Sequence, residues 1–311
     1  MNRFLAIGEC MLQLREERKG KFAQGFGGDS LNTAIYMSRL GIDSSYLSAL
    51  GDDEWSDAML GQWQKEGVDT SLVRRIEDRM PGLYLIQNRP DGERQFSYWR
   101  ERSPAREIFD RDDQHLAQSF LKYDWIYFTG VTLSLYSREA RDLLFDYLQR
   151  ANDAGAWIVF DTNYREKGWP DRKDMDRAFR QAIEISDILF ASHEDMTGVF
   201  GRSGDAMFEI AKCVEKVLKM PDASARLVWR NHDEVVAPLP VKKVIDTTAA
   251  GDSFAAAYLA ARIKNKPPLL AAADGHLLAN AVIQQPGAII PRSKMPKSLL
   301  RKKREKHAQT S

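Results

Sequence analysis

Short apolar runs alternate with amphipathic stretches along most of the chain. Runs of strand length occur at residues 3–7, 46–50, 125–129, 157–161 and 188–191. Apolar residues recur at helical spacing at residues 30–40, 55–66, 138–152, 175–185 and 254–263. The alternation of strands and helices predicts an α/β fold in which helices cover both faces of a mostly parallel sheet.

One section departs from this alternation. Residues 83–88 and 94–100 are strand-like runs rich in Tyr, Phe and Trp, and Pro90-Asp91-Gly92 between them are turn residues. A hairpin has no place in a series of parallel strands, so we expect it in a small β lid outside the main sheet. We expect one domain over residues 1–296, with the lid inserted at about 10–26 and 80–101. The basic residues 297–311 are expected to form a disordered tail.

Composition narrows the function classes. Among 311 residues, 45 Lys and Arg balance 44 Asp and Glu, so the net charge of +1 gives no reason to expect a nucleic-acid or membrane partner. No apolar run approaches the roughly 20 residues of a membrane span. The two cysteines, Cys10 and Cys213, form no disulfide framework, and no Cys/His cluster suggests zinc. We therefore expect a cytoplasmic protein.

Small residues lead up to Asp252 in the stretch Ala249-Ala250-Gly251-Asp252, just before a helical pattern. The first amides of a helix are unpaired and lie at the positive end of its dipole, so an anion can approach bare backbone there. A carboxylate beside that anion could accept the proton of an attacking hydroxyl. The stretch fits phosphoryl transfer to an alcohol. An ordinary N-cap aspartate after a small-residue turn explains the same residues.

A second stretch, Gly27-Gly28-Asp29-Ser30-Leu31-Asn32, lies near the N-terminus. The glycines expose backbone, and Asp29 and Asn32 offer polar groups at the start of a helix. Such a mixture of donors and acceptors suits a polyhydroxylated substrate. A loop that ends in an N-cap at Asp29 is the simpler interpretation.

Together, the two stretches resemble the two signatures of the ribokinase-type (PfkB) carbohydrate kinases, over about residues 3–296. Within that superfamily the chain is similar to the 2-keto-3-deoxygluconate kinases. This similarity lies in Gly8-Glu9-Cys10-Met11, Pro81-Gly82-Leu83-Tyr84, Tyr98-Trp99-Arg100, Asp161-Thr162-Asn163-Tyr164-Arg165 and Gly287-Ala288-Ile289-Ile290-Pro291-Arg292. The resemblance implies a ribokinase-like fold, ATP and Mg²⁺ as cofactors, phosphorylation of the sugar acid at its 6-hydroxyl, and a homodimer formed through the lid.

The resemblance also implies roles for single residues. Asp252 would be the general base, and the backbone of Ala249, Ala250 and Gly251 would hold the transferred phosphoryl group. The expected substrate contacts are Gly28, Asp29, Asn32, Tyr84, Tyr98, Arg100 and Arg165, with the two arginines on the carboxylate. The expected nucleotide contacts are Asn163, Arg165, Lys219, Gly251 and Asn280. Asp195 would serve Mg²⁺ through water, and Asp246 and Thr248 would hold a monovalent cation such as K⁺. Surface ion pairs and lid packing remain the simpler explanations for the arginines and tyrosines.

Three positions depart from the pattern of relatives. Pro221, in Lys219-Met220-Pro221, replaces a glycine, and proline has no N–H to offer a phosphate. Ser192 stands where asparagine is usual, and Ala249 stands where glycine is common. Two alternatives therefore remain. One is a kinase of a neutral sugar such as fructose or ribose, against which Arg100 and Arg165 argue. The other is a sugar-acid-binding protein with an impaired ATP site.

Overall fold

The computed structural model describes residues 2–18, 20–88, 94–201 and 204–300. Nine strands within these ranges form one sheet in the order β13-β12-β11-β10-β9-β8-β1-β4-β5. They are β1 (Arg3–Ile7), β4 (Asp43–Leu50), β5 (Val73–Arg75), β8 (Trp125–Thr129), β9 (Trp157–Asp161), β10 (Ile188–Ser192), β11 (Glu215–Lys219), β12 (Ala225–Trp229) and β13 (His232–Val236). The strands from β5 to β11 are parallel, and β12 and β13 are added antiparallel at one edge. The mostly parallel sheet is confirmed.

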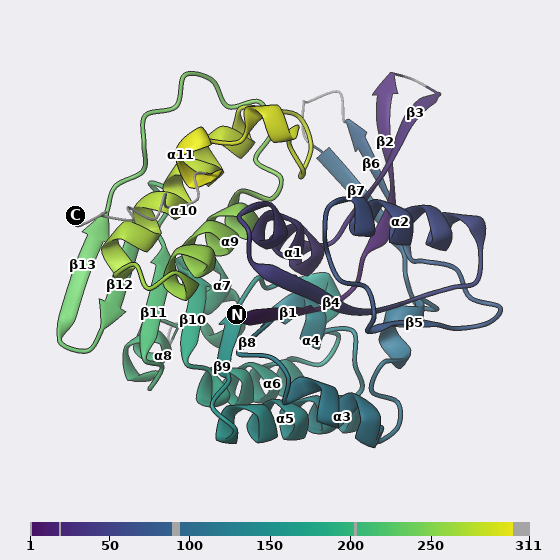
Figure 1. Cartoon of the computed structure of the whole chain (residues 1–311), viewed down its shortest axis with the longest axis horizontal. Coiled ribbons are helices and arrows are strands. Elements are labelled where there is room, and N and C mark those ends of the chain that lie inside the picture. Colours follow the sequence, from purple (N-terminus) through teal and green to yellow (C-terminus); the bar gives the residue numbers. More distant parts are fainter. Residues whose placement is uncertain (1, 19, 89–93, 202–203, 301–311) are drawn as a thin grey trace, which may run out of the picture.

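Helices cover both faces of this sheet (Figure 1). On one face lie α1 (Asp29–Arg39), α2 (Glu54–Lys65), α9 (Ala250–Ile263) and α10 (Pro268–Ile283). On the other lie α3 (Gln114–Phe120), α4 (Gly130–Leu133), α5 (Arg138–Asp153), α6 (Arg172–Ile185), α7 (His193–Phe200) and α8 (Gly204–Ile210). Successive residues of β1 face the two layers in turn: Phe4 and Ala6 lie in one core, and Leu5 and Ile7 in the other. Burial on both faces explains why this strand is apolar from Phe4 to Ile7.

The helix starts differ in a way that bears on function. Asp53, Ser137 and Asp171 cap α2, α5 and α6 through side-chain oxygens that accept backbone N–H groups. In contrast, α1 begins after Gly28 and α9 after Ala249, and neither residue supplies a side-chain cap. The first amides of α1 and α9 are therefore not covered by the preceding side chain.

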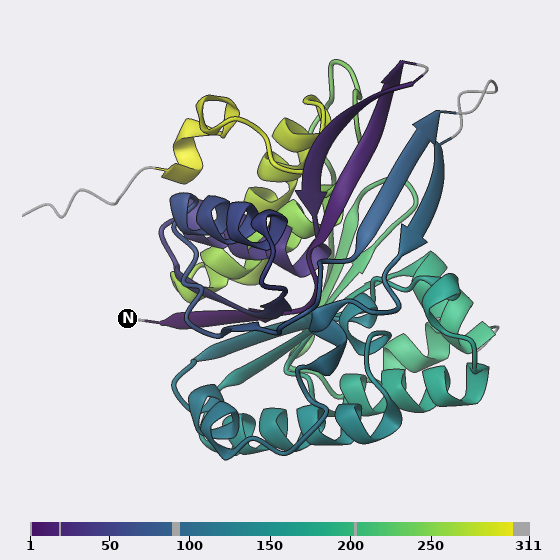
Figure 2. The ribbon, with the colours of Figure 1, turned by 90° about the vertical axis from the view of Figure 1, so that its right-hand side faces the viewer.

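A second sheet projects from the body as the lid (Figure 2). Its order is β3-β2-β6-β7, with β2 (Met11–Arg18), β3 (Lys21–Gly27), β6 (Leu83–Asn88) and β7 (Arg94–Trp99). The strands β6 and β7 pair antiparallel as the expected hairpin, and β2 and β3 fall in and next to the expected segment 10–26; the turn at residues 89–93 lies outside the described residues. Large apolar side chains of the lid remain exposed: Phe22, Phe96, Tyr98 and Trp99.

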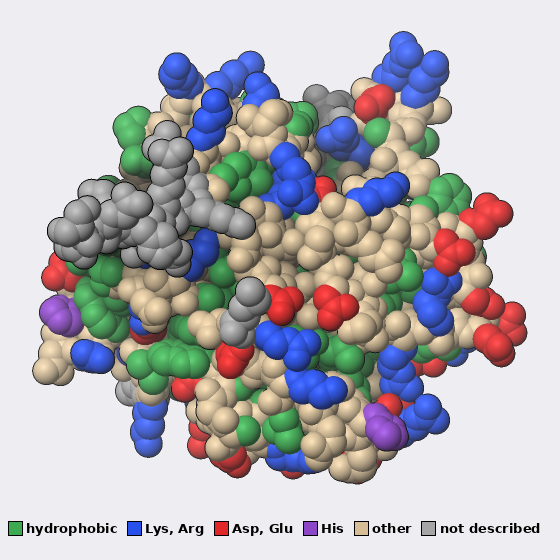
Figure 3. Space-filling model, viewed as in Figure 1, with side chains coloured by type: hydrophobic (Ala, Val, Ile, Leu, Met, Phe, Trp, Pro, Cys, Tyr) green, Lys and Arg blue, Asp and Glu red, His purple; other side chains and the backbone are tan. Residues whose placement is uncertain are grey.

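The C-terminal segment differs from the expectation at its start. Lys297–Leu300 form the short helix α11, so the predicted disordered tail does not begin at residue 297, and residues 301–311 lie outside the described part. Short 3₁₀ turns occur at Pro104–Glu107, Glu166–Gly168 and Arg292–Lys294. Among the described residues, no helix is long and apolar enough to cross a membrane. Basic and acidic side chains are scattered over the face shown in Figure 3, with apolar and neutral atoms between them.

Candidate active site

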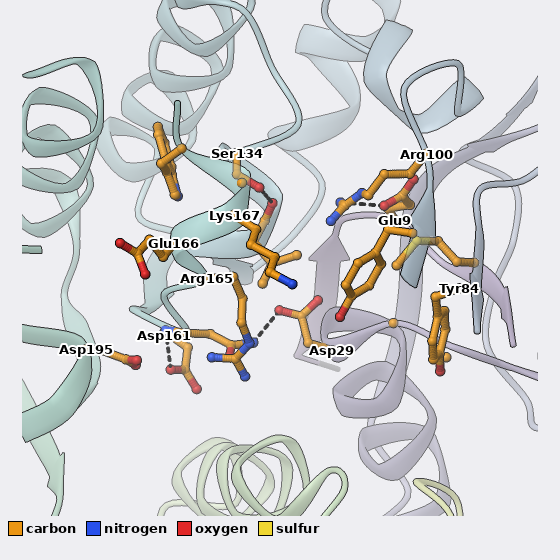
Figure 4. Close-up of a pocket in the computed structure, with 18 of the residues that line it drawn as sticks. Glu9, Asp29, Tyr84, Arg100, Ser134, Asp161, Arg165, Glu166, Lys167 and Asp195 are labelled. Atoms are coloured by element: carbon orange, nitrogen blue, oxygen red, sulfur yellow. Dashed lines mark hydrogen bonds and ion pairs between the residues drawn. The ribbon is translucent and has the colours of Figure 1, made fainter. Parts of the chain in front are cut away.

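A cleft of about 1530 Å³ runs between the lid and the edge of the large sheet where its parallel strands end. Asp161, Ser192 and Lys219, which end β9, β10 and β11, all line it. Ligands of open parallel sheets bind outside the carboxyl ends of the strands, so this location is typical of a substrate site. Figure 4 shows lid residues on one side and strand-end residues on the other. Both stretches singled out in the sequence line the cleft: Gly27–Asn32 contributes Gly27, Gly28, Asp29 and Asn32, and residues 249–252 all contribute.

The start of α9 presents bare backbone to the cleft. Ala249 has φ 61° and ψ 18°, in the left-handed region, and α9 begins at the next residue. The amide of Ala250 donates to the Thr247 carbonyl at 3.2 Å, so it is not available to a ligand. The amides of Gly251 and Asp252 have no hydrogen-bond partner among the described residues. Of the amides expected to hold the phosphoryl group, that of Ala250 is therefore used within the turn, whereas those of Gly251 and Asp252 are open to the cleft; the anion hole itself stays a prediction.

Asp252 faces residues from the other signature. The side-chain amide of Asn32 donates to its Oδ2 at 2.8 Å, which joins α1 and α9 at the floor of the cleft. Burial, and after it the charge of Asp29, raise the pKa of Asp252 to about 7, against the lowering effect of the Asn32 hydrogen bond. A carboxyl group with a pKa near neutrality can accept a proton and release it again at working pH.

Asp29 is held by three donors. Its Oδ1 accepts the amide of Ser30 at 2.8 Å, and its Oδ2 accepts the Thr129 hydroxyl at 2.7 Å and the Asn163 side-chain amide at 2.6 Å. Asp29 is the first residue of α1, and Gly28 occupies the N-cap position. A Cβ at Gly28 would lie 2.1 Å from the Glu9 carbonyl oxygen, so only glycine fits there. Thr129 was missed in the sequence, where its only signal was its position at the end of a strand.

Lys219 lies at the same place as the α9 start. Its Nζ donates to both carboxylate oxygens of Asp161, at 3.0 and 3.1 Å, and lies 3.5 Å from where a Cβ of Gly251 would be. Burial raises the pKa of Asp161, while the Lys219 ammonium opposes that shift. The pair places a cation beside the free amides of Gly251 and Asp252.

The backbone amides of the loop after Lys219 donate hydrogen bonds within the loop itself. The Met220 amide donates to the Ser224 carbonyl at 2.9 Å, and the Ala223 amide donates to the Met220 carbonyl at 2.9 Å. The Ser224 amide donates to the Asp222 carboxylate at 2.9 Å, and Pro221 has no N–H. The backbone of this loop is thus a closed turn without free amides at Met220, Ala223 or Ser224.

The lid side of the cleft carries the expected aromatic and basic residues. Tyr84 and Tyr98 stack with ring centroids 6.1 Å apart, and the Tyr84 hydroxyl donates to Gln13 Oε1 at 2.5 Å. Arg165 does not belong to the lid: it follows β9, projects into the cleft in Figure 4, and donates from Nη1 to the Tyr164 carbonyl at 2.7 Å. Arg100 is paired with the buried Glu9, with Nη2 and Oε2 2.5 Å apart. No sequence pattern predicts that partner, because Glu9 precedes the lid and only tertiary packing joins the two.

Three of the expected ion-binding residues are tied into local hydrogen bonds. Asp195 lines the cleft, and its carboxylate accepts the Thr162 hydroxyl at 2.8 Å. Its backbone N–H donates to the Ser192 hydroxyl oxygen, which caps α7. Asp246 accepts the Thr248 hydroxyl at 2.6 Å. In the described part of the chain, no group of three or more His, Cys, Asp or Glu side chains could by itself hold a metal ion. A metal here would need oxygen ligands from substrate phosphates and water, which suits Mg²⁺.

Asn280 does not line the cleft. Its side-chain amide donates to the carbonyls of Leu239 and Pro240, both at 3.1 Å, and so ties α10 to the long loop that precedes the α9 signature. Asn280 is not among the residues that line the cleft, so its expected contact with the nucleotide base stays a prediction.

Comparisons with known proteins agree with this geometry. The chain is 38% identical to 2-dehydro-3-deoxygluconokinase of Escherichia coli K12 over 302 residues, which cover 93% of this chain and 97% of the relative. The enzyme of the same name from Dickeya dadantii is also 38% identical, with the same coverage. The crystal structure of 2-dehydro-3-deoxygluconokinase from Thermotoga maritima shares the fold at a TM-score of 0.82 and 21% identity, over 96% of this chain and 98% of that one. The model of the pfkB family carbohydrate kinases matches residues 1–295, and the chain therefore belongs to that family.

Proposed function

We propose that this kinase transfers the γ-phosphate of ATP to the 6-hydroxyl of 2-keto-3-deoxygluconate, which is also called 2-dehydro-3-deoxygluconate. The observation that carries the proposal is one cleft with a carboxylate of raised pKa at an uncapped helix start and two arginines, Arg100 and Arg165. The names of the relatives at 38% identity support the same substrate.

The transfer step follows from the α9 start. The 6-hydroxyl oxygen forms a bond to the γ-phosphorus, the bond from that phosphorus to the ADP oxygen breaks, and Asp252 accepts the hydroxyl proton. The amides of Gly251 and Asp252 and the Lys219 ammonium stabilise the negative charge of the phosphoryl group. Mg²⁺ would neutralise phosphate charge when bound, with Asp195 as its outer partner. Closure of the lid would exclude water and so favour transfer over hydrolysis.

Recognition of the acid is assigned to the two arginines. A guanidinium matches a carboxylate with paired hydrogen bonds, whereas a neutral sugar offers it no anion. Tyr84 and Tyr98 would pack against the sugar, and Gly28, Asp29 and Asn32 would bind its hydroxyls.

The assay that tests this proposal is a coupled measurement of ADP release with a panel of substrates. With ATP and Mg²⁺, we expect kcat/KM for the sugar acid to exceed that for fructose or ribose by about 100-fold or more, as loss of a charged partner implies. A preference for fructose or ribose would assign the cleft to a neutral sugar. Calorimetry with ATP and Mg²⁺ settles the remaining alternative, since no heat at millimolar ATP would indicate a binder with an impaired nucleotide site.

Several further features belong to the same proposal. Residues 1–296 form one kinase domain with the lid inserted, and Asp246 and Thr248 bind a monovalent cation such as K⁺. The exposed lid aromatics Phe96, Tyr98 and Trp99 support a homodimer formed through the lid. Cys10 and Cys213 are free thiols, which supports the reducing cytoplasm as its location.

A further inference from the structure

Glu9 is a buried carboxylate at the lid end of the cleft that has no part in the transfer step. It lies between β1 and β2, and its side chain is 1% exposed. Its Oε2 lies 2.5 Å from Nη2 of Arg100, as the dashed line in Figure 4 shows. A buried charge is costly unless it is paired, so the contact compensates both side chains.

The surroundings of the pair leave little freedom. A Cβ at Gly82, just before β6, would lie 3.1 Å from both Arg100 Cβ and Glu9 Oε1, so the chain passes close against both residues. The Tyr136 hydroxyl is buried and has no hydrogen-bond partner among the described residues. Burial, and after it the charge of Glu9, raises the pKa of Tyr136, which places the phenol within reach of the same carboxylate. Glu9, Arg100 and Tyr136 all line the cleft.

The orientation of the guanidinium follows from which of its atoms are buried. Nε and Nη2 of Arg100 form one edge of the planar group; both are buried and have no hydrogen-bond partner among the described residues, so Glu9 meets this edge as an ion pair. That edge faces the protein and Glu9. The side chain as a whole is 20% exposed and lines the cleft, and Nη1 is not among its buried, unpaired atoms, so we assign the Nη1 end to a ligand in the cleft. A ligand carboxylate would therefore meet a guanidinium that is already fixed in place.

We propose that Glu9 is a positioning residue for substrate recognition: it holds the buried edge of Arg100 so that the Nη1 end faces the carboxylate of the sugar acid. This role rests on the proposed function. Two effects of Glu9 oppose each other, because its charge repels the substrate while its contact preorganises Arg100. Because the pair is buried, we expect the preorganising effect to be the larger one. Without Glu9, the buried edge has no charged partner and the side chain must turn towards water, so acid binding weakens.

The test begins with Glu9→Gln, which keeps the size of the side chain and removes its charge. We expect KM for 2-keto-3-deoxygluconate to rise about tenfold while kcat changes by less than about twofold, because the groups around Asp252 are untouched. Glu101→Gln is the matched control. Glu101 borders the same cleft and is exposed, and among the described residues its carboxylate accepts a hydrogen bond only from the backbone N–H of Arg100, at 3.2 Å. Its replacement should leave KM within about twofold of the wild-type value.

A double-mutant cycle separates positioning from a general structural effect. In an Arg100→Met background, Glu9→Gln should no longer raise KM, because the side chain through which it acts is absent. An equal rise of KM in both backgrounds, or a fall of KM in the single variant, would overturn the role of Glu9. Should Glu9→Gln fail to fold, Glu9→Asp keeps the charge on a shorter arm and should raise KM by a smaller factor, and an unchanged KM in Glu9→Asp would count against the proposal.

The same measurements distinguish the two proposals. A wild-type enzyme that prefers a neutral sugar refutes the proposed function, and the role of Glu9 falls with it. An enzyme that uses the sugar acid, and in which Glu9→Gln changes neither KM nor kcat, refutes the role of Glu9 alone.

Discussion

The two ends of the cleft are built by different means. The transfer end, defined here as Gly251, Asp252 and Lys219, combines bare amides of an uncapped helix with a strand-end cation. The acid end, defined here as Glu9 and Arg100, consists of side chains packed where the lid meets the large sheet. The first end is made mainly of local backbone geometry and the second of tertiary contacts. Local geometry leaves a short motif in the sequence, whereas a tertiary contact does not.

This difference explains what the sequence could predict. The ranges of β1, β8 and β9 were predicted to the residue, because strands buried on both faces are continuous apolar runs. The meeting of Asn32 with Asp252 was predicted only in outline, through the resemblance. The pairing of Glu9 with Arg100 and the loss of the Ala250 amide to Thr247 were not predicted, because both depend on where the folded chain places a partner.

The loop after β11 lies between these cases. Pro221 signalled from the sequence that the loop lacks an amide, and the structure adds that Met220, Ala223 and Ser224 use theirs within the turn. The Lys219 ammonium stands beside the α9 start and offers charge where the loop offers no amides. In our proposal, charge at the transfer end therefore comes from this side chain and not from the amides of the loop.

The largest expected effect separates chemistry from recognition. Asp252→Asn should lower kcat by about 10³-fold or more, since the amide cannot accept the hydroxyl proton, while the dissociation constant for the sugar acid stays within about threefold. Coupled assays and calorimetry measure the two quantities. Glu9→Gln should do the reverse, with KM raised and kcat kept. Wild-type turnover in Asp252→Asn would exclude Asp252 as the base and remove the distinction between the two ends.

Variants of the two cations sharpen the same comparison. Lys219→Met should lower kcat/KM for ATP by about 100-fold, because a charge-assisted contact with phosphate is lost, with little change in KM for the sugar acid. Arg100→Met should raise KM for the sugar acid by about 30-fold and leave KM for ATP unchanged. Steady-state kinetics with each substrate varied in turn gives all four values. If both variants change the KM of the same substrate, ATP and the sugar acid are not bound by separate ends of the cleft.

The pH dependence of activity should come from the transfer end and not from the acid end. Asp252 must be deprotonated to accept a proton, and burial with the nearby Asp29 raises its pKa to about 7. Activity should therefore be lost as the pH falls through about 7, with kcat/KM decreasing about tenfold per pH unit below it. Asn32→Ala removes a hydrogen bond that lowers this pKa, so the acid limb should move to higher pH. Arg100→Met should leave the limb in place, and a profile flat between about pH 5 and 8 would contradict the assignment.

The smallest expected effect tests the backbone itself. Ala249 adopts φ 61° at the start of α9, a conformation that costs a residue with a Cβ about 1 kcal/mol or more and glycine almost nothing. Glycine also loses more chain entropy on folding, which offsets part of that gain. Ala249→Gly should therefore raise the free energy of unfolding by roughly 0.5 kcal/mol, seen as a small rise in Tm by calorimetry. Ala250→Gly is the matched control: Ala250 is the first residue of α9 and has no positive φ, so the same change should lower stability, by up to roughly 0.5 kcal/mol. Opposite signs at neighbouring alanines would show that the transfer end holds its amides in place at a cost in backbone strain, and equal signs would show that it does not.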